Sequence, residues 1–218
     1  MSEISTRKRS PQEEFWAGEF GDEYIERNSD DAIYTANVAF FAGILRRAGR
    51  VRSVVELGAN IGMNIRALRC LLPAARMAAV ELNSKACARL RQIDGLTVHE
   101  QSILDFAPTE TVDLAFTKGV LIHIDPTQLR RTYDRLYHSS HRLILVAEYY
   151  SPTPVDVTYR GNEGYLCKRD FAGEMLDLFG DLQLVDYGFC YRRDPAFPLD
   201  DINWFLLEKK GGQVTSGL

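Results

Sequence analysis

The chain has 218 residues, of which 45% are hydrophobic and 26% are charged, and its formal net charge is −4. This length suits a single α/β domain with a full core, and the acidic balance argues against a protein that binds duplex nucleic acid, which usually has a basic surface. The four cysteines are dispersed without a C-x-x-C pair, so the sequence favours neither a structural zinc site nor a disulfide scaffold.

The sequence carries no signal for secretion or membrane insertion. Its N-terminus is polar and charged, and no apolar run approaches the roughly 18 residues that a membrane-spanning helix needs. We therefore expect a cytoplasmic protein without a membrane partner.

The first fifty residues are expected to form a helical cap ahead of the main sheet. Residues 1–12 are polar and predicted to be a flexible segment, whereas residues 13–28 place aromatic side chains among acidic ones in the pattern of an amphipathic helix. A second helix follows, with Asp30 or Asp31 as its N-cap. We expect this cap, residues 13–50, to cover a ligand cleft.

From residue 51 to about residue 210, apolar strands alternate with helices in one domain, ahead of a tail at 211–218 that is expected to be flexible. Such alternation implies a mostly parallel sheet with helices on both faces, the Rossmann-like arrangement. A short polar segment joins the last two of the seven strands, so these two should pair antiparallel. The predicted strands lie at about 52–57, 76–81, 96–101, 112–117, 142–148, 182–190 and 202–208, and the helices at about 62–71, 84–93, 126–138 and 170–179.

The first of these strands ends in the glycine-spaced turn ELGANIG, residues 56–62. Gly58 and Gly62 permit positive φ and let a ligand approach the backbone. The turn has neither the Gly-Lys-Ser/Thr ending of a phosphate-binding loop nor the G-x-G-x-x-G dinucleotide fingerprint. Glu56 would repel a pyrophosphate and attract a cationic or zwitterionic ligand. These features favour S-adenosylmethionine (SAM), which carries an ammonium and a sulfonium but no phosphate.

The ends of the second and third strands extend the predicted cofactor site. Glu81 closes the second strand, where a carboxylate commonly accepts hydrogen bonds from ribose hydroxyls, and Leu82 follows it. After the third strand, Ile103 is expected against an adenine ring, with Ser102 or Asp105 near its exocyclic amine. The alternative for Asp105 is that it caps a turn.

The fourth strand runs into Thr117, Lys118 and Gly119, and His123 follows shortly after. Ligands bind at the carboxyl ends of the strands in open α/β sheets, so the first three residues are expected at the cofactor and His123 near the reaction zone. The alternative for His123 is a helix-capping or core role.

Together these segments resemble the successive motifs of class I SAM-dependent methyltransferases. Longer strings outside the cofactor motifs resemble, more narrowly, the pseudaminic acid biosynthesis-associated methylase family, over about residues 11–210. The strings are FWAGEFGDEY (15–24), TKGVLIHI (117–124), AEYYSPTP (147–154), KRDFA (168–172) and DDINWFLLE (200–208). The resemblance implies methyl transfer from SAM, often linked to nonulosonic-acid sugar pathways.

One residue departs from the class I pattern. Asn60 stands where many of these enzymes have a middle glycine. Because asparagine tolerates a left-handed backbone better than other non-glycine residues, we expect the turn to persist.

Methyl transfer from a sulfonium is an in-line displacement, so the protein mainly holds the acceptor and the methyl carbon in near-attack geometry. A base is needed only when the acceptor must lose a proton. The candidates near the ends of strands four and five are His123, Glu148, Tyr149 and Tyr150. Glu148 ends an apolar strand, where a carboxylate must be solvated or paired, and it is expected to receive an ammonium or guanidinium-like acceptor.

A segment that contains proline and glycine, residues 149–169, is expected to form a substrate lid. Aromatic side chains would enclose a cationic or sugar-like acceptor by cation–π attraction, and basic side chains would bind an anionic group. The alternative for Trp16 and Tyr24 is ordinary packing, and the alternative for Lys168 and Arg169 is a turn that caps the following helix. The aromatic candidates are Trp16, Tyr24, Tyr150 and Tyr159, and the basic candidates are Arg160, Lys168 and Arg169.

We therefore predict a SAM-dependent methyltransferase that modifies an amine or amidine nitrogen of a sugar-like or amino-acid-like small molecule. A small-molecule O-methyltransferase and a non-catalytic SAM-binding module are the alternatives. Without a basic patch or an Asn-Pro-Pro-Tyr motif, a nucleic-acid or protein methylase is disfavoured. The four histidines lie at no metal-ligand spacing, so no metal is expected, and the sequence leaves monomer and homodimer open.

Overall fold

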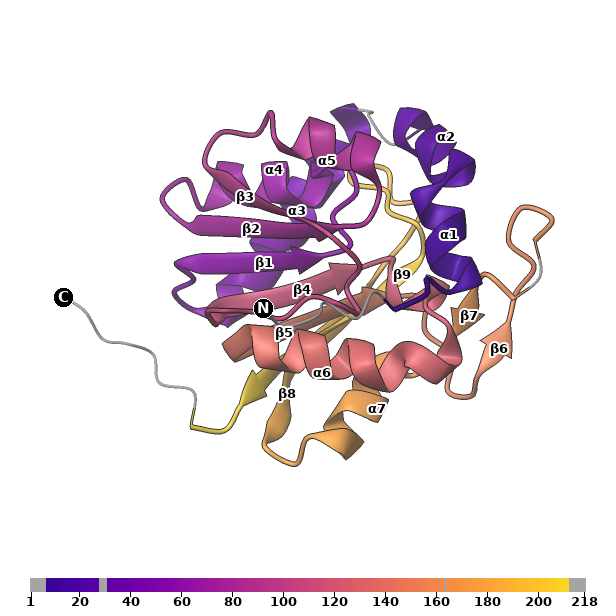
Figure 1. Ribbon diagram of the computed structural model, residues 1–218. Coiled ribbons are helices and arrows are strands. Elements are labelled where there is room, and N and C mark those ends of the chain that lie inside the picture. Colours follow the sequence, from indigo (N-terminus) through magenta and orange to yellow (C-terminus); the bar gives the residue numbers. More distant parts are fainter. Residues whose placement is uncertain (1–6, 28–30, 163, 212–218) are drawn as a thin grey trace, which may run out of the picture.

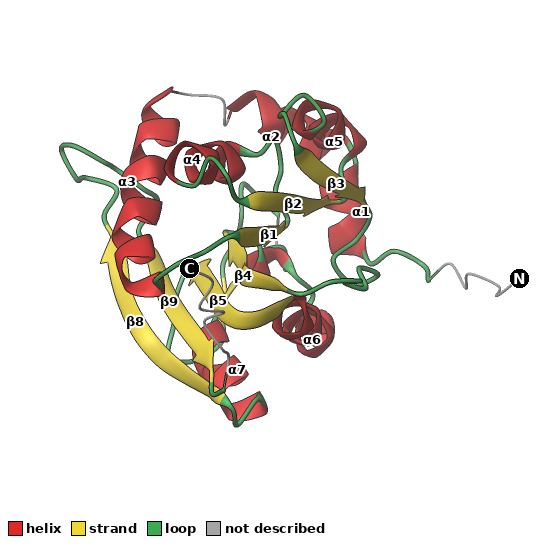
Figure 2. Cartoon of the chain, turned by 90° about the vertical axis from the view of Figure 1, so that its left-hand side faces the viewer, coloured by secondary structure: helices red, strands yellow, loops and turns green. Residues whose placement is uncertain are grey.

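The computed structural model describes residues 7–27, 31–162 and 164–211. Within these ranges the chain forms one seven-stranded sheet in the order β3-β2-β1-β4-β5-β9-β8, with helices on both sides (Figures 1 and 2). The strands β1 to β5 run parallel, and β9 pairs antiparallel with both β5 and β8. The strands are β1 Ser53–Leu57, β2 Arg76–Glu81, β3 Leu96–Glu100, β4 Val112–Lys118, β5 Ser140–Glu148, β8 Leu182–Cys190 and β9 Ile202–Lys209.

The sequence prediction of a mostly parallel seven-stranded sheet with an antiparallel hairpin is confirmed. Five helices follow the predicted pattern closely, although the helix predicted at 126–138 begins as the short 3-10 helix η2 and continues as α6. They are α3 Asp31–Ala48, α4 Met63–Leu71, α5 Ser84–Leu90, α6 Leu129–Ser139 (after η2 Pro126–Gln128) and α7 Phe171–Leu178. No helix in the described ranges is both long and apolar enough to cross a membrane.

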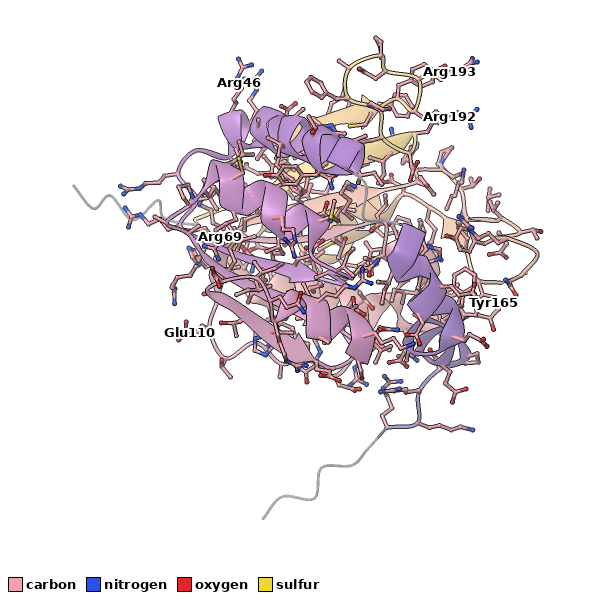
Figure 3. The ribbon with its side chains drawn as sticks, turned by 90° about the horizontal axis from the view of Figure 1, so that it is seen from above. Arg46, Arg69, Glu110, Tyr165, Arg192 and Arg193 are labelled. Atoms are coloured by element: carbon pink, nitrogen blue, oxygen red, sulfur yellow. The ribbon has the colours of Figure 1, made fainter. Side chains whose placement is uncertain are left out.

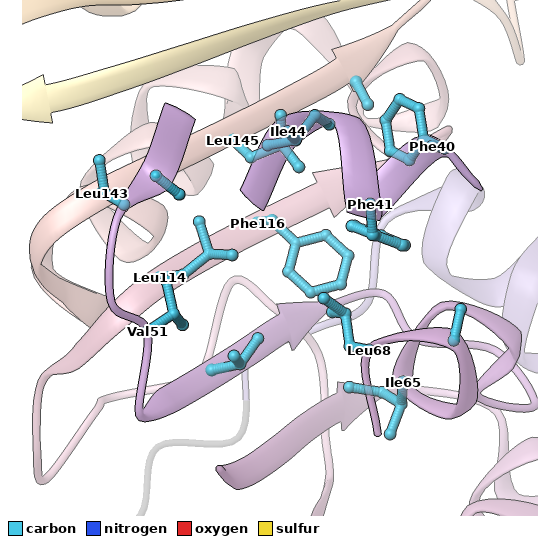
Figure 4. Close-up of a cluster of buried hydrophobic side chains, with 14 of the residues drawn as sticks. Phe40, Phe41, Ile44, Val51, Ile65, Leu68, Leu114, Phe116, Leu143 and Leu145 are labelled. Atoms are coloured by element: carbon cyan, nitrogen blue, oxygen red, sulfur yellow. The ribbon is translucent and has the colours of Figure 1, made fainter. Parts of the chain in front are cut away.

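Two hydrophobic clusters hold the helices against opposite faces of the sheet, because side chains alternate along each strand. On one face Phe116 of β4 packs edge-on against Phe41 of α3, with ring centroids 5.4 Å apart, among buried side chains of α4 and β5 (Figure 4). On the other face Ile144 of β5 lies in a cluster with Tyr133 of α6 and Phe171 of α7.

The amphipathic segment predicted as one helix at 13–28 is two helices, α1 Pro11–Ala17 and α2 Glu19–Arg27. Gly18 adopts an extended backbone between them, and Ser10 and Glu13 form a reciprocal capping box at the start of α1. Gly21 has no Cβ, and a Cβ there would lie 1.9 Å from the carbonyl oxygen of Trp16, so the close approach of α2 to α1 requires glycine. Helical periodicity alone does not reveal such a break.

The described part of the N-terminal segment makes an ion pair with α1, and the predicted lid contains two short strands. Arg7 lies 2.5 Å from the carboxylate of Glu13, while residues 1–6 and 212–218 lie outside the described residues, as does the N-cap candidate Asp30. Asp31 is the first helical residue of α3. The lid contains a short antiparallel pair, β6 Val155–Asp156 and β7 Cys167–Lys168, that the sequence pattern did not predict.

Candidate functional site

A cavity of about 600 Å³ opens at the carboxyl ends of the parallel strands, between the strand ends, helices α1 to α3 and the lid. A volume of this size is typical of small-molecule sites. The predicted site residues that line it are Trp16, Tyr24, Gly58, Asn60, Glu81, Leu82, Ser102, Ile103, Lys118, Gly119, His123, Tyr149, Tyr159 and Arg160. The predicted site residues outside its lining are Glu56, Gly62, Asp105, Thr117, Glu148, Tyr150, Lys168 and Arg169.

The turn after β1 has a left-handed backbone at three positions. The φ angles are 82° at Gly58, 46° at Asn60 and 83° at Gly62, so Asn60 takes the conformation expected for it. Packing also requires glycine: a Cβ on Gly58 would lie 2.6 Å from a methyl carbon of Val120, and one on Gly62 would lie 2.8 Å from a methyl carbon of Leu90. Of the three left-handed residues, Gly58 and Asn60 line the cavity and Gly62 does not.

Glu81 joins this turn to the end of β2. One carboxylate oxygen accepts a hydrogen bond of 2.7 Å from the amide of Asn60, and the other accepts bonds of 2.8 Å from the amides of Leu82 and Asn83. Burial raises the pKa of Glu81, and the three amides oppose this effect. Each carboxylate oxygen has two lone pairs, so the group retains capacity to accept hydrogen bonds from a ligand.

Glu56 does not line the cavity, in contrast to the direct ligand contact expected from the sequence. Its side chain is fully buried, and it accepts a hydrogen bond of 2.6 Å from the amide group of Asn64, which does line the cavity. Burial raises the pKa of Glu56 to about 8, with the nearby ammonium of Lys118 acting in the opposite direction. Glu56 therefore reaches the cavity lining only indirectly, through its hydrogen bond with Asn64.

At the far end of the cavity, helix α1 contributes a residue that the sequence pattern missed. The hydroxyl of Ser102 donates a hydrogen bond to the buried carboxylate of Glu13. Burial alone would raise the pKa of Glu13, but hydrogen bonds from Arg7, the amide of Ser10 and Ser102 outweigh it and lower the pKa to about 2. The capping-box spacing of Ser10 and Glu13 was the available signal, although it indicates only a helix start.

Ile103 is buried and lines the cavity as expected, whereas Asp105 is exposed and lies on the outside. The Asp105 carboxylate forms ion pairs with Arg7 at 3.3 Å and Arg131 at 3.4 Å. These contacts place Asp105 as a surface anchor for the N-terminal segment and α6.

His123 ends the short helix η1, Leu121–His123, and lies at the cavity wall. Its Nδ1 is 2.7 Å from the carbonyl oxygen of Tyr165 in the lid. Because a carbonyl only accepts, Nδ1 carries the proton, and the lone pair of the neutral ring lies on Nε2. Burial lowers the pKa of His123 to about 4, so the ring is neutral near pH 7.

Aromatic rings surround His123 and join the lid to the cap. Trp16 and Tyr159 lie with their ring centroids 4.6 Å and 5.0 Å from that of His123. Tyr165, which Figure 3 shows at the edge of the molecule beside the N-terminal helices, lies 4.4 Å from Phe15 by the same measure. The predicted aromatic enclosure is thus present in part, and it includes Phe15 and Tyr165, which the sequence did not single out.

The remaining lid residues divide between the cavity and the outer surface. Tyr149 lines the cavity, and the ammonium of Lys168, which is outside the lining, lies 5.2 Å from the Tyr149 ring centroid. Arg160 also lines the cavity. Tyr150 is exposed, and Arg169 forms an ion pair of 2.7 Å with Glu174 of α7. Glu174 thus supplies the partner that Arg169 was expected to find in a substrate.

Several further polar residues that line the cavity were not predicted, because tertiary packing alone brings them there. Asn37 of α3 and Asn64 of α4 have side-chain oxygens that are buried without a hydrogen-bond partner among the described residues. Asp125 and Asp200 add carboxylates to the lining. No group of three or more histidine, cysteine or acidic side chains in the described ranges is arranged to hold a metal ion.

The fold is that of class I SAM-dependent methyltransferases. The 1,6-didemethyltoxoflavin N1-methyltransferase of Burkholderia thailandensis superposes with a TM-score of 0.67 and 16% identity, covering 94% of this chain and 93% of that one. The SAM-bound magnesium protoporphyrin IX methyltransferase of Synechocystis PCC 6803 gives a TM-score of 0.65, 12% identity and coverage of 94% and 100%.

A third similar structure is CalS10, a SAM-bound amino pentose methyltransferase from Micromonospora echinaspora, with a TM-score of 0.62, 10% identity and coverage of 87% and 95%. No protein-family profile and no curated protein matches the sequence. At these identities the likeness establishes the fold.

Proposed function

We propose that this chain is a SAM-dependent methyltransferase that acts on a small molecule, with an amine or amidine nitrogen favoured over a hydroxyl as the methyl acceptor. The observation that carries the proposal is the left-handed turn after β1, which Glu81 ties to the end of β2 at the wall of the cavity. In open α/β sheets this edge is where nucleotide-like ligands bind.

The residues of this edge suit the parts of SAM. Gly58 allows the ligand to lie against bare backbone, Glu81 can accept hydrogen bonds from ribose hydroxyls, and Ile103 offers an apolar wall to a purine ring. When bound, SAM supplies an electrophilic methyl group on a sulfonium. The tasks left to the chain are to hold an acceptor in line with that methyl group, to exclude water and to receive a proton.

His123 is the proposed proton acceptor. In the transfer the acceptor nitrogen forms a bond to the methyl carbon, the carbon–sulfur bond breaks with its electrons on sulfur, and a nitrogen proton passes to Nε2. A histidine with a pKa of about 4 is a weak base, and it matches a neutral nitrogen, which attacks through its lone pair, better than a hydroxyl that must first be ionised. Tyr149 lies at the same wall and remains a second candidate for contact with the acceptor.

The proposed class of acceptor is supported by the charges and rings that line the cavity. Asp125 and Asp200 attract a positively charged molecule, and Trp16, Tyr24 and Tyr159 offer faces for cation–π or sugar stacking. These features support a modified sugar or an amino-acid-like intermediate, in line with the resemblance to the pseudaminic acid biosynthesis-associated methylase family. A small-molecule O-methyltransferase is the second candidate, because a neutral histidine lies at the reaction zone.

The test of the cofactor is calorimetric titration of the folded protein with SAM and S-adenosylhomocysteine. Glu81→Ala is expected to weaken binding by about 10-fold or more, since a hydrogen bond to a charged group contributes roughly 1.5–3 kcal/mol. Gly58→Val is expected to weaken binding as well, because Gly58 has a φ of 82° that a β-branched residue resists, and its Cβ would collide with Val120. Gly49→Val is the matched control, because Gly49 has a similar φ of 63° and a Cβ there would meet no described atom within 4 Å. Absence of binding by the wild type would overturn the proposal, and binding without turnover of any amine acceptor would favour a non-catalytic module.

A further inference from the structure

Glu148 at the end of β5 is a buried carboxylate that does not reach the cavity. Its side chain is 2% exposed, and one oxygen accepts hydrogen bonds of 3.0 Å from the backbone amides of both Val120 and Leu121. Burial raises the pKa of Glu148 to about 7, against the effect of these amides. The expectation that Glu148 receives the acceptor directly is therefore not supported by its position.

The two amides lie where the loop after β4 enters η1: Val120 is the last residue before η1, and Leu121 is the first residue of η1. The amide of His123 donates a hydrogen bond of 2.9 Å to the carbonyl oxygen of Val120. The side chain of Val120 packs closely on Gly58: a Cβ on Gly58 would lie 2.6 Å from a methyl carbon of Val120. One carboxylate thus holds a loop that touches the glycine turn at one end and carries His123 at the other.

The loop is fixed from the lid side as well, by the bond between Nδ1 of His123 and the carbonyl of Tyr165. A displacement of η1 would lengthen this bond, and the ring would then be free to exchange its two neutral tautomers. A desolvated carboxylate is costly unless it is hydrogen-bonded. The two amides meet this need at one oxygen of Glu148, whereas the other oxygen is buried without a hydrogen-bond partner among the described residues.

We propose that Glu148 is a positioning residue, which fixes η1 so that His123 keeps its bond to Tyr165 and presents Nε2 to the cavity. The geometric part of this proposal concerns His123 itself, and its catalytic meaning rests on the proposed function.

The test compares Glu148→Gln with Glu148→Leu. Glutamine keeps an oxygen that accepts from the two amides, whereas leucine has a similar size and accepts nothing. Long-range ¹⁵N NMR of the imidazole nitrogens reports the tautomer of His123. We expect the wild type and Glu148→Gln to show the single Nδ1–H form, and Glu148→Leu to show a mixture of both tautomers. Glu208→Leu is the control, since Glu208 of β9 lies beside Arg142, at 3.6 Å, and away from η1.

Kinetics supply the second readout once an acceptor is found. Glu148→Leu is expected to lower kcat by about 10-fold or more with little change in the affinity for S-adenosylhomocysteine, and Glu148→Gln is expected to stay within about 3-fold of the wild type. A folded Glu148→Leu protein with the wild-type tautomer would overturn the proposal. If that variant does not fold, Glu148→Asp replaces it: its shorter side chain should also disturb the tautomer, and a wild-type spectrum would equally refute the proposal.

The NMR readout needs neither SAM nor an acceptor. A wild-type tautomer in Glu148→Leu leaves the methyl-transfer proposal intact, whereas failure of the protein to bind SAM leaves the tautomer experiment interpretable. The two proposals can therefore fail separately.

Discussion

Asn60 holds a left-handed backbone between two glycines, and its amide donates a hydrogen bond of 2.7 Å to Glu81. A left-handed backbone costs a residue with a Cβ roughly 1–2 kcal/mol, and less for asparagine than for most others. The sequence predicted this conformation correctly because the left-handed preference of asparagine is local, although the bond to Glu81 comes from another strand.

Substitutions at Asn60 should follow this local preference. Asn60→Gly is expected to leave the free energy of unfolding within about 0.5 kcal/mol of the wild type, whereas Asn60→Val should lower it by about 1–2 kcal/mol because a β-branched side chain resists positive φ. Urea unfolding measures both variants. Equal stability of the valine and glycine variants would show that the turn relaxes in solution.

His123 offers a second test at the scale of one side chain. In His123→Asn the amide nitrogen can still donate to the carbonyl of Tyr165, but no group replaces Nε2. If His123 is the base, turnover should fall by about 10²-fold while binding of S-adenosylhomocysteine is retained. With a pKa of about 4, the wild-type histidine should give a flat rate between about pH 6 and 8, so a rate that falls with a pKa near 6.5 would contradict this assignment.

Among the elements, the cap and the lid depend on one another. Phe15 of α1 stacks on Phe20, with ring centroids 4.0 Å apart, and contacts Tyr165 in a tilted geometry, with ring centroids 4.4 Å apart. The side-chain amide of Gln12 donates a hydrogen bond of 3.4 Å to the carbonyl of Gly164. These contacts hold the outer part of the lid against helices from the other end of the domain.

Removal of the Phe15 ring should release this lid. We expect Phe15→Ala to speed tryptic cleavage after the exposed Arg160 several-fold, because proteolysis follows the population of the open form. S-adenosylhomocysteine should slow the cleavage again if it binds beneath the cap. Tyr187→Ala removes an aromatic ring that is 66% exposed on β8 and serves as the control. Equal cleavage rates in all three proteins would mean that the ring contacts do not hold the lid.

The elements also show why part of the site escaped prediction. Strand ends were predictable because apolar runs stop where the backbone turns, and this placed Gly58, Glu81 and Ser102 correctly at the cavity. Glu56 and Glu148 lie at or next to the ends of such strands as well. However, Glu56 accepts a hydrogen bond from Asn64, and Glu148 accepts from the amides of Val120 and Leu121. No local sequence pattern predicts a partner from another element.

For the whole molecule, the buried carboxyl groups set the dependence of stability on pH. Burial raises the pKa of Glu56 to about 8 and that of Glu148 to about 7, so the folded state binds protons that the unfolded state has released. Stability then falls as pH rises from the ordinary carboxyl pKa of 4.5 up to these values, and it levels off above them. His123 has the opposite effect, because burial lowers its pKa from 6.5 to about 4: its contribution makes stability rise with pH between these two values and is constant above them.

The unliganded protein should therefore lose stability between about pH 6.5 and 8, where Glu56 and Glu148 titrate in the folded state. The loss is expected to be on the order of 2 kcal/mol, and thermal unfolding at several pH values measures it. Glu56→Gln should remove about two thirds of this loss, because Glu56 has the higher pKa of the two. A midpoint that stays constant across the window in the wild type would show that both carboxyl groups are ionised throughout.

The strand order has a consequence for the chain as it leaves the ribosome. β9 separates β5 from β8, although it is synthesised after both of them. Until β9 emerges, the hydrogen-bonding edge of β5 stays open, and β8 has no partner strand in the sheet. An open apolar edge is a template for other chains, so translation that pauses between β8 and β9 would expose the nascent protein to aggregation.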